Sequence, residues 1–319
     1  MKLLRKYRLR IGYPEKRYTT EIDTGIMESS ANEITDLHID FTVTKSDNSS
    51  DTLNTAKISI YNLNDQSKRL IEKPDSVVIL EAGWENDSFG LIFQGDIVTY
   101  NHVKNGADWV TTVECADGYV GVREAIVSKN YPPDTSVQSI LTDLIKGEAG
   151  DEVYYSAVGV QFTRPPLGLG LAIGEMKGLG IFDTYENGLS VSKPTKQAID
   201  DICYAHRLKW SIQDGKAYVS GIRGDESPKY TMPLISEETG LIQSPEIIYE
   251  AIAKRKNDKT PVKGYKFKCT MNHEVLPEIF VKIVSEQVDA IAKVKKVRHS
   301  GSFEGGSWDT EVEAIVQEF

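Results

Sequence analysis

The stretch Trp109-Val110-Thr111-Thr112-Val113-Glu114-Cys115 occurs a second time, in altered form, as Trp308-Asp309-Thr310-Glu311-Val312-Glu313-Ala314. Both segments read W-x-T-x-V-E followed by a small residue, and a glycine lies shortly before each, at Gly106 and Gly306. Apolar and polar residues alternate along both segments, which is the pattern of a half-buried strand. The two ends of the chain therefore carry related strands.

Two further matches lie upstream of these strands, in the same order and with similar gaps. Residues 74–80 (PDSVVIL) parallel residues 277–283 (PEIFVKI), and residues 57–60 (KISI) parallel residues 266–269 (KFKC). A single match of this kind arises easily by chance, because alternating strands look alike. Three matches in order indicate that a β-rich module is duplicated.

Strand patterns fill the first part of the chain, from residue 3 to about residue 125. The basic N-terminus is followed by no apolar stretch of a signal peptide, and Tyr7, Leu9, Ile11 and Tyr13 alternate with polar residues, so we interpret it as the first strand. One short helix is expected over residues 64–72, with an asparagine or aspartate as its cap. Strands of this number and spacing predict a barrel or sandwich.

The middle of the chain reads differently. Asp134 is expected to cap a helix with one apolar face, and a second helix is expected to start at residues 192–195. Two strands, residues 208–212 and 217–220, flank an Asp214-Gly215 hairpin turn. The expected buried residues of the two helices are Val137, Ile140, Leu141, Leu144, Ile145, Ala198, Ile199, Ile202 and Cys203.

These patterns predict a mainly β protein with an α+β insert. The expected units are a first barrel at residues 1–125, a central α+β domain at residues 126–235, and a second barrel of the same type at residues 236–319.

Composition narrows the classes of function. No run of 18 apolar residues occurs, so we expect no membrane insertion. The cysteines Cys115, Cys203 and Cys269 lie far apart, which indicates reduced thiols and no disulfide framework. The net charge of −10 argues against nucleic-acid binding, although an acidic wall suits a passage through which DNA slides without sticking.

Two histidine-containing patterns are candidate functional sites. Cys203-x-x-His206 supplies half of a structural zinc site, but no second ligand pair lies at a suitable spacing, so Cys203 is interpreted as a core residue. His102 and His299 occupy equivalent places in the two repeats and have no partner acid or nucleophile in sequence. We expect both to satisfy hydrogen bonds of strands or turns.

A glycine-rich run and two carboxylate pairs are further candidates for functional sites. Residues 167–180 do not follow the G-x-G-x-x-G spacing and predict a mobile loop, which we expect to order against a neighbouring protein. Asp200-Asp201 and Glu237-Glu238 are adjacent in sequence, and neighbours on a helix point apart, so the first pair cannot flank one glycosidic bond. Both pairs are interpreted as solvated faces.

Four aromatic residues remain open between core and interface: Tyr61, Trp84, Tyr100 and Tyr265. No catalytic, cofactor-binding or metal-binding residue is predicted, and the chain is interpreted as a structural protein without enzymatic activity.

Several segments resemble one known family. Residues 54–63 (NTAKISIYNL) and 90–97 (GLIFQGDI) resemble the first barrel of baseplate hub proteins from contractile-tailed bacteriophages. Residues 239–245 (TGLIQSP) are similar to the segment that enters the second barrel of such hubs, and residues 297–310 are similar to their C-terminal hairpin.

This resemblance implies a homotrimer with two tail-tube-like barrels per chain. Three chains then present six barrels, which adapt a six-fold tail tube to a three-fold spike. The implied partners are the tail tube protein, the spike protein and other baseplate proteins, with DNA passing through an axial channel. The implied location is the tail baseplate of the virion, after synthesis in the host cytoplasm. Because the first copy carries an extra helix, the ring is expected to be only pseudo-six-fold.

Two alternatives stay open at this point. One is a tail-associated peptidoglycan hydrolase that uses a carboxylic acid. The other is the hub of a tailocin or of a secretion-type injection machine, whose mechanics are shared with phage tails.

Overall fold

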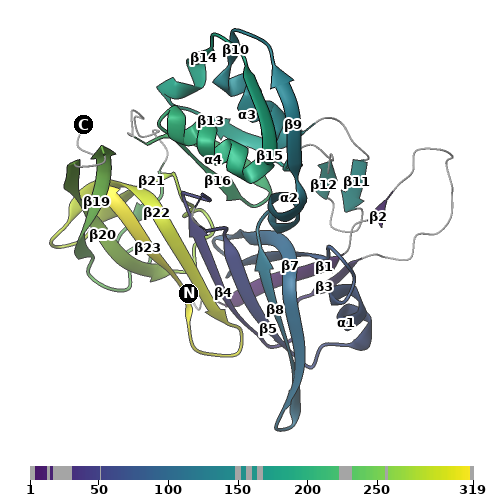
Figure 1. Ribbon diagram of the computed structural model, residues 1–319. Coiled ribbons are helices and arrows are strands. Elements are labelled where there is room, and N and C mark those ends of the chain that lie inside the picture. The colour runs from purple at the N-terminus through teal and green to yellow at the C-terminus, as the bar shows by residue number, and fades with distance from the viewer. Residues whose placement is uncertain are drawn as a thin grey trace.

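A computed structural model describes residues 4–12, 15–16, 31–50, 52–147, 152–155, 160–163, 168–222, 232–255 and 258–316. Its main feature is a 13-stranded sheet that curls into two barrel-like halves, with a smaller α+β unit packed above them (Figure 1). The sheet runs β19-β20-β23-β22-β4-β5-β8-β7-β6-β1-β3, with β21 and β18 extending from β22. The predicted fold class, mainly β with two tail-tube-like barrels flanking an α+β insert, is confirmed.

The first barrel contains seven strands and one helix. Tyr7, Leu9 and Ile11 of its first strand are buried, as the alternation predicts, and Tyr13 lies outside the described residues. The side chain of Asn64 accepts a hydrogen bond from the Ser67 N–H and caps the helix, which confirms that prediction. The elements are β1 (Arg5–Gly12), β3 (Ala31–Ile34), β4 (Ile39–Ser46), β5 (Thr55–Tyr61), α1 (Asp65–Ile71), β6 (Val77–Trp84), β7 (Phe89–Asn105) and β8 (Asp108–Ala116).

The second barrel repeats this order without the helix, since the described residues 271–279 between its second and third long strands contain no helical turn. Its elements are β18 (Leu234–Ile235), β19 (Glu246–Arg255), β20 (Asp258–Thr270), β21 (Phe280–Val284), β22 (Asp289–Ser302) and β23 (Trp308–Val316). Strand order β4-β5-β8-β7-β6 in the first barrel matches β19-β20-β23-β22-β21 in the second.

The strand register supports the duplication residue by residue. Thr111 lies opposite His102 in the β7–β8 hairpin, and Thr310 lies opposite His299 in the β22–β23 hairpin. Each ladder skips one residue four positions before its histidine, which places equivalent bulges in β7 and β22. Asp75 and Glu278, which follow the matched prolines, both adopt positive φ. The sequence matches therefore correspond to matching places in the fold.

The central unit packs two helices against short sheets. Trp210 and the apolar faces of α3 and α4 form its core, and the predicted buried faces of both helices are confirmed. Asp214 and Gly215 have φ values of 53° and 77°, which fits the predicted hairpin turn. The helix α2 (Tyr119–Glu124) connects the first barrel to this unit. The elements of the unit are β9 (Ile126–Tyr131), β10 (Thr135–Ser136), α3 (Val137–Lys146), β11 (Glu152–Tyr155), β12 (Val160–Thr163), β13 (Ala172–Met176), η1 (Leu179–Phe182), β14 (Thr184–Tyr185), β15 (Leu189–Pro194), α4 (Thr195–Ala205), β16 (Leu208–Gln213) and β17 (Lys216–Gly221), and β2 (Glu15–Lys16) pairs with β11.

Asp134 does not cap the first central helix, contrary to the prediction. Asp134 has a φ of 61° and lies in a turn where its N–H donates to the Tyr185 carbonyl. Ser136 takes the cap position, and its side chain accepts from the Ser139 N–H. The two-residue strand β10 separates the turn from the helix, and this separation was not visible in the sequence pattern.

The glycine-rich run is not a mobile loop over its described part, residues 168–180, and this prediction was wrong. Leu169 and Leu171 are buried in the central core, and β13 pairs in parallel with β17. Gly168 lies so close to Gly147 that a Cβ on it would come within 2.4 Å of the Gly147 Cα. The glycines therefore allow close packing within the chain itself, and a contact of this run with a neighbouring protein stays a prediction.

In the part of the chain that the structure describes, no helix combines the length and the apolar character that crossing a membrane requires.

Candidate functional site

The two barrels share one continuous sheet because β4 of the first pairs with β22 of the second. The ladder is antiparallel and runs from Ser46 opposite Lys296 to Asp40 opposite Ser302. Figure 1 shows β4 and β22 lying side by side where the two halves meet. A contact built from main-chain hydrogen bonds fixes the register of the two barrels as well as their proximity.

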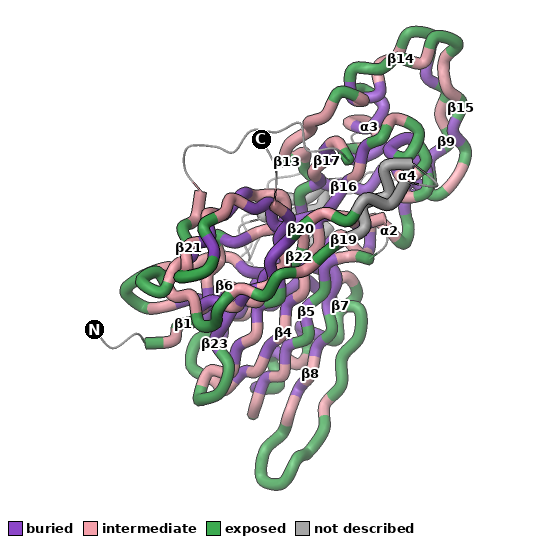
Figure 2. Tube along the Cα trace, turned by 90° about the vertical axis from the view of Figure 1, so that its left-hand side faces the viewer, coloured by how far each residue is buried: buried purple, intermediate pink, exposed green. Residues whose placement is uncertain are grey.

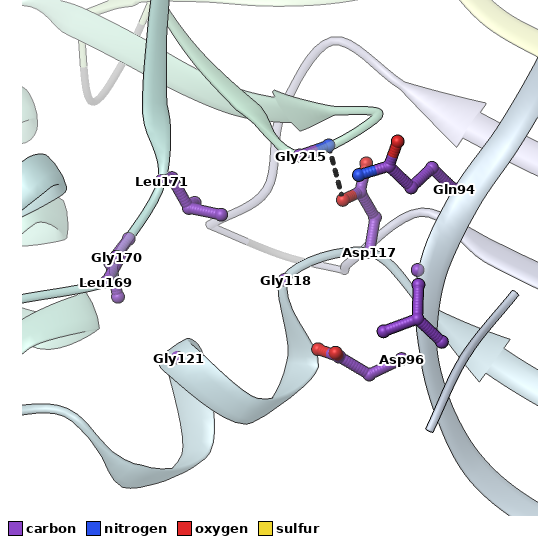
Figure 3. Close-up of a pocket in the computed structure, with 11 residues that line it drawn as sticks. Gln94, Asp96, Asp117, Gly118, Gly121, Leu169, Gly170, Leu171 and Gly215 are labelled. Atoms are coloured by element: carbon purple, nitrogen blue, oxygen red, sulfur yellow. Dashed lines mark hydrogen bonds between the residues drawn. The ribbon is translucent and has the colours of Figure 1, made fainter. Parts of the chain in front are cut away.

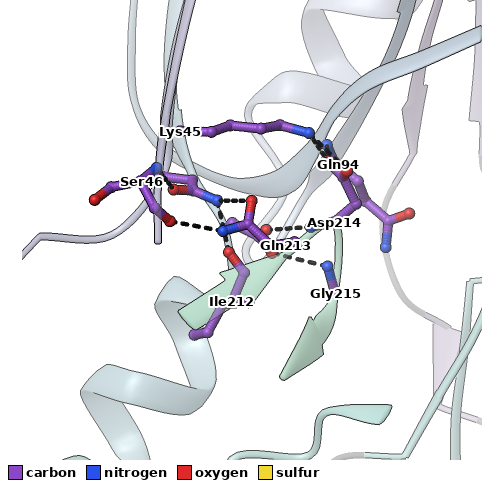
Figure 4. A network of polar contacts seen from close by, with 9 residues as sticks. Lys45, Ser46, Gln94, Ile212, Gln213, Asp214 and Gly215 are labelled. Atoms are coloured by element: carbon purple, nitrogen blue, oxygen red, sulfur yellow. Dashed lines mark hydrogen bonds and ion pairs between the residues drawn. The ribbon is translucent and has the colours of Figure 1, made fainter. Parts of the chain in front are cut away.

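The tip of the β16–β17 hairpin contacts the first barrel at Lys45 of β4 and Gln94 of β7 (Figure 4). The Nζ of Lys45, whose side chain is 0% exposed, lies 2.6 and 2.8 Å from the two carboxylate oxygens of Asp214. The same carboxylate accepts a hydrogen bond of 3.1 Å from the Gln94 N–H. A buried ammonium requires such a partner, so this ion pair positions the hairpin against the barrel.

Asp117 holds the same hairpin tip from the other side. Its carboxylate accepts hydrogen bonds from the backbone N–H groups of Asp214 and Gly215, at 2.5 and 3.0 Å. Burial raises the pKa of Asp117 well above its ordinary value, and the nearby Asp214 carboxylate adds to this, although the two N–H groups and Lys45 act in the opposite direction. The first barrel thus binds both the side chain of Asp214 and the backbone N–H groups of the Asp214-Gly215 turn.

Amide side chains continue this contact. Asn54 donates to the Ile212 carbonyl at 2.6 Å and to the Gln213 side-chain oxygen at 2.8 Å. Gln213 in turn donates to the Ser46 carbonyl at 2.6 Å (Figure 4). Because these buried polar groups are bound to one another, a shift of the central unit would leave several of them unpaired.

A cluster of five charged side chains joins all three units. Lys209 of the central unit binds Asp47, which follows β4, and Glu278 of the second barrel. Lys293 of the second barrel lies 2.8 Å from Glu278, and Lys295 lies 2.5 Å from Asp47. We call Asp47, Lys209, Glu278, Lys293 and Lys295 the junction cluster.

Within the junction cluster, Glu278 and Lys209 are held in their ionised forms. Burial alone would raise the pKa of Glu278, but the ammonium groups of Lys209 and Lys293 overcome it and lower that pKa to about 2. Burial would lower the pKa of Lys209, yet Glu278 and Asp47 together raise it above its ordinary value. The cluster is therefore a set of mutually dependent ion pairs.

An aromatic contact also crosses from the second barrel into the first. Trp308 at the start of β23 is only 4% exposed and belongs to the core of the first barrel. Its indole N–H donates to the Gly83 carbonyl at 2.9 Å, and its ring packs edge-on against Phe41. Arg5 of β1 donates to the carbonyls of Ser302 and Gly306 in the same hairpin.

A small cavity lies beside the hairpin tip, lined by Asp96, Asp117 and the glycine-rich run (Figure 3). Its volume is about 30 Å³, enough for roughly one water molecule and far below that of a small-molecule pocket. Asp96 accepts a hydrogen bond of 2.9 Å from the Val120 N–H at the start of α2. The carboxylates here cap and fix backbone groups.

The two histidine-containing patterns make structural contacts. Cys203 is buried, and His206 hydrogen-bonds Asp183 at 2.7 Å. Among the described residues, no group of three or more candidate metal ligands occurs. The predicted strand hydrogen bonds of the two histidines are confirmed, since His102 bonds Thr111 and His299 bonds Thr310, each at 2.9 Å. Burial lowers the pKa of His299 to about 3, so its ring is neutral.

The two aspartates of the first carboxylate pair bind different partners. Asp200 accepts from the Trp210 indole N–H at 2.8 Å, and Asp201 pairs with Lys193 at 2.7 Å. Glu237 and Glu238 are exposed, as expected. Only Asp200 departs from the predicted solvated face, because it satisfies a buried indole.

The four open aromatics divide between the two interpretations. Tyr265 lies in the core of the second barrel, whereas Tyr100 is exposed on β7. Trp84 packs on the first core and donates to the Met271 carbonyl at 3.1 Å, so it contacts both barrels. Tyr61 donates to Asp40 at 3.0 Å.

The charged residues of the contacts between units were not found from sequence. Asp214 was recognised only as a turn residue and Glu278 only as part of the repeat, and Lys45 reads as a polar position on a strand. The only sequence feature that these residues share is their position, because each lies at the end of a strand or in a turn that contacts another unit.

Replacing Asp214 with asparagine tests the hairpin contact while keeping a residue suited to positive φ. We expect the free energy of unfolding to fall by about 2 kcal/mol, because Lys45 keeps an amide oxygen but loses its counter-charge. Adding Lys45→Met should restore much of the loss. Chemical denaturation of the three proteins measures both effects, and an unchanged single variant would contradict the assigned role of the ion pair.

Comparisons with known proteins agree with the observed architecture. No family model matches the chain, and no curated protein matches it in sequence. Among solved structures, a tail protein from Neisseria meningitidis MC58 superposes with a TM-score of 0.58 at 10% identity, covering 97% of this chain and 96% of that one. A 43 kDa tail protein of prophage MuSo2 from Shewanella oneidensis gives 0.56 at 7% identity, covering 90% and 94%.

A third solved structure comes from a secretion machine. The E. coli c3393 protein, described as a component of the type VI secretion system with structural similarity to the T4 bacteriophage tail proteins gp27 and gp5, gives a TM-score of 0.54 at 11% identity and covers 89% of this chain and 74% of that one. At such identities the likeness concerns the fold alone. The chain has a phage tail and baseplate-like fold, which is shared with type VI secretion proteins.

Proposed function

We propose that this protein is a structural baseplate hub, a homotrimer that joins a six-fold tail tube to a three-fold spike and leaves an axial channel for DNA. The observation that carries the proposal is the pair of equivalent barrels fused into one sheet within one chain. A chain with two equivalent barrels offers six of them in a trimer, which is a direct way to match the two symmetries. Its partners are the tube, spike and neighbouring baseplate proteins, and its place is the virion tail after synthesis in the host cytoplasm.

The proposed setting is a contractile tail. We also propose a structural role without catalysis, which the contacts of the polar residues support. The buried carboxylate of Asp117 and the partly buried carboxylates of Asp214 and Glu278 bind lysines or backbone N–H groups and join the units to one another. The pair on which a peptidoglycan hydrolase would draw, Asp200 and Asp201, binds different partners.

The proposed division into domains is 1–125, 126–235 and 236–319. The three large core clusters among the described residues support a three-part chain. Ile235 belongs to the third core, so the boundary between the central unit and the second barrel falls close to β18.

The location of the chain in an assembled particle tests the function. We expect a tagged copy to appear at the junction of tube and spike by electron microscopy, and particles made without the chain to lack a complete baseplate. Complementation with the intact gene is the control. Normal tails in its absence, or a tag at the capsid or on a fibre, would rule out the hub.

The hub of a secretion-type injection machine is a second candidate, favoured by the likeness to the type VI secretion component. Purified particles distinguish the two. A capsid filled with DNA above the tail identifies a phage, whereas particles without capsids or DNA identify a tailocin or a secretion-type machine.

A further inference from the structure

The distal half of β7 has an open edge, whereas the equivalent edge of β22, its counterpart in the second barrel, is paired. In the second barrel, β22 pairs first with β21 and then, from Lys296 to Ser302, with β4. In the first barrel, β7 pairs with β6 only as far as Asp96. Beyond that point no described strand lies on its outer edge, and Figure 2 shows the hairpin extending away with exposed residues.

The strand β19 has the complementary open edge. Its repeat mate β4 is covered by β22, and Val43 and Lys45 there are 0% exposed. Because β4 pairs with β5 as β19 pairs with β20, the two registers define equivalent positions in β4 and β19. The equivalents of Val43 and Lys45 are Ile247 and Tyr249, which are 55% and 70% exposed. Within the described chain, β19 pairs only with β20.

A tryptophan shows the same contrast. Trp308, at the tip of the second hairpin, is buried in the core of the first barrel and 4% exposed. Its mate Trp109, at the tip of the first hairpin, is 47% exposed, and Tyr100 and Val103 of the same hairpin are exposed as well. Open apolar strand edges are rare on monomers and are typical of interfaces.

From these three contrasts we propose that β19 of one copy pairs antiparallel with the distal half of β7 of the next copy, repeating between chains the β4–β22 contact made within each chain. We apply the register of β22 and β4 within the chain to their equivalents β7 and β19 in neighbouring copies. This register places Val103 opposite Glu246, His102 opposite Ile247, and Tyr100 opposite Tyr249. Trp109 then enters the second barrel of the neighbour, as Trp308 enters the first barrel of its own chain.

This contact is head-to-tail, since each copy offers β7 to one neighbour and β19 to the other. Such an interface closes into a ring when its rotation allows and otherwise forms an open filament. The expectation of three copies rests on the proposed function, whereas the strand pairing rests on the internal repeat. The two can therefore fail separately.

Disulfide cross-linking tests the register directly. Opposite residues of an antiparallel pair lie within the Cα separation that a disulfide spans. The double variant Val103→Cys with Glu246→Cys should convert most of the oxidised, purified protein into a covalent trimer on a denaturing gel. Background should be low because Cys115, Cys203 and Cys269 are buried.

Two matched variants control the result. Thr42→Cys with Ser300→Cys places cysteines at the equivalent positions within one chain, so it should give an oxidised monomer. Val103→Cys with Ile248→Cys is out of register by two residues and should remain largely uncross-linked. Trp109→Ala should shift the wild-type chain from trimer towards monomer in light scattering, with its circular dichroism unchanged.

The outcomes separate the pairing from the proposed function. Trimers that form but fail to cross-link, while the intrachain control does, overturn the pairing and leave the hub proposal standing. A chain that stays monomeric up to its solubility limit also overturns the pairing, and the particle location then decides the hub independently. A covalent ladder longer than a trimer supports the pairing and overturns three-fold closure.

Discussion

Replacing Trp308 with alanine should lower the free energy of unfolding by about 3–5 kcal/mol, the range for removing a large buried aromatic. The indole fills space in the core of the first barrel although it belongs to the second, and its N–H satisfies the Gly83 carbonyl. The substitution therefore removes packing and leaves a buried carbonyl without its donor. Chemical denaturation followed by intrinsic fluorescence measures the loss.

Trp109→Ala is the matched control, because this tryptophan holds the equivalent position but is half exposed in a single chain. We expect it to change the stability of the monomer by less than about 1 kcal/mol, the usual range for exposed positions. Equal losses for the two variants would show that Trp308 acts through its own strand rather than through the contact between barrels.

Replacing Glu278 with glutamine should destabilise the protein by about 3 kcal/mol at neutral pH, because it leaves Lys209 and Lys293 without one of their counter-charges. The pKa of Glu278 is lowered to about 2, below the value of about 4.3 in an unfolded chain. Its contribution is thus fully present above that unfolded value and is lost as the pH falls towards 2.

The difference between the wild type and Glu278→Gln should therefore shrink as the pH falls below about 4.5 and nearly vanish near pH 2. Unfolding curves at a series of pH values measure this difference, and the contribution of His299 cancels because both proteins contain it. Glu238→Gln, at an exposed position, is the control and should change little. A gap that stays constant with pH would assign the loss to packing instead of charge.

The periodicity of the sequence predicted the strands well, because alternation and turn chemistry act locally. The matches around Trp109 and Trp308 also placed the repeat correctly, since equivalent strands need equivalent buried positions. The same reasoning failed for Asp134, where a two-residue strand intervenes before the helix. It failed as well for the glycine-rich run, whose leucines are buried by elements distant in sequence.

The contacts between units could not be predicted because they depend on which strand ends meet. Lys45 is a charged residue on an alternating strand, and its burial becomes intelligible only when Asp214 arrives from the central unit. Trp109 and Trp308 look alike in sequence, yet one is exposed and the other buried. Their difference is set by the neighbour on each side, and local pattern carries no information about that neighbour.

The β4–β22 ladder also bears on the kinetics of assembly. Because both strands belong to one chain, this contact forms within the chain and does not depend on the concentration of the protein. In the proposed ring, every second contact between barrels is then complete before any two copies collide. In that ring, only the remaining contacts would depend on the concentration of the protein.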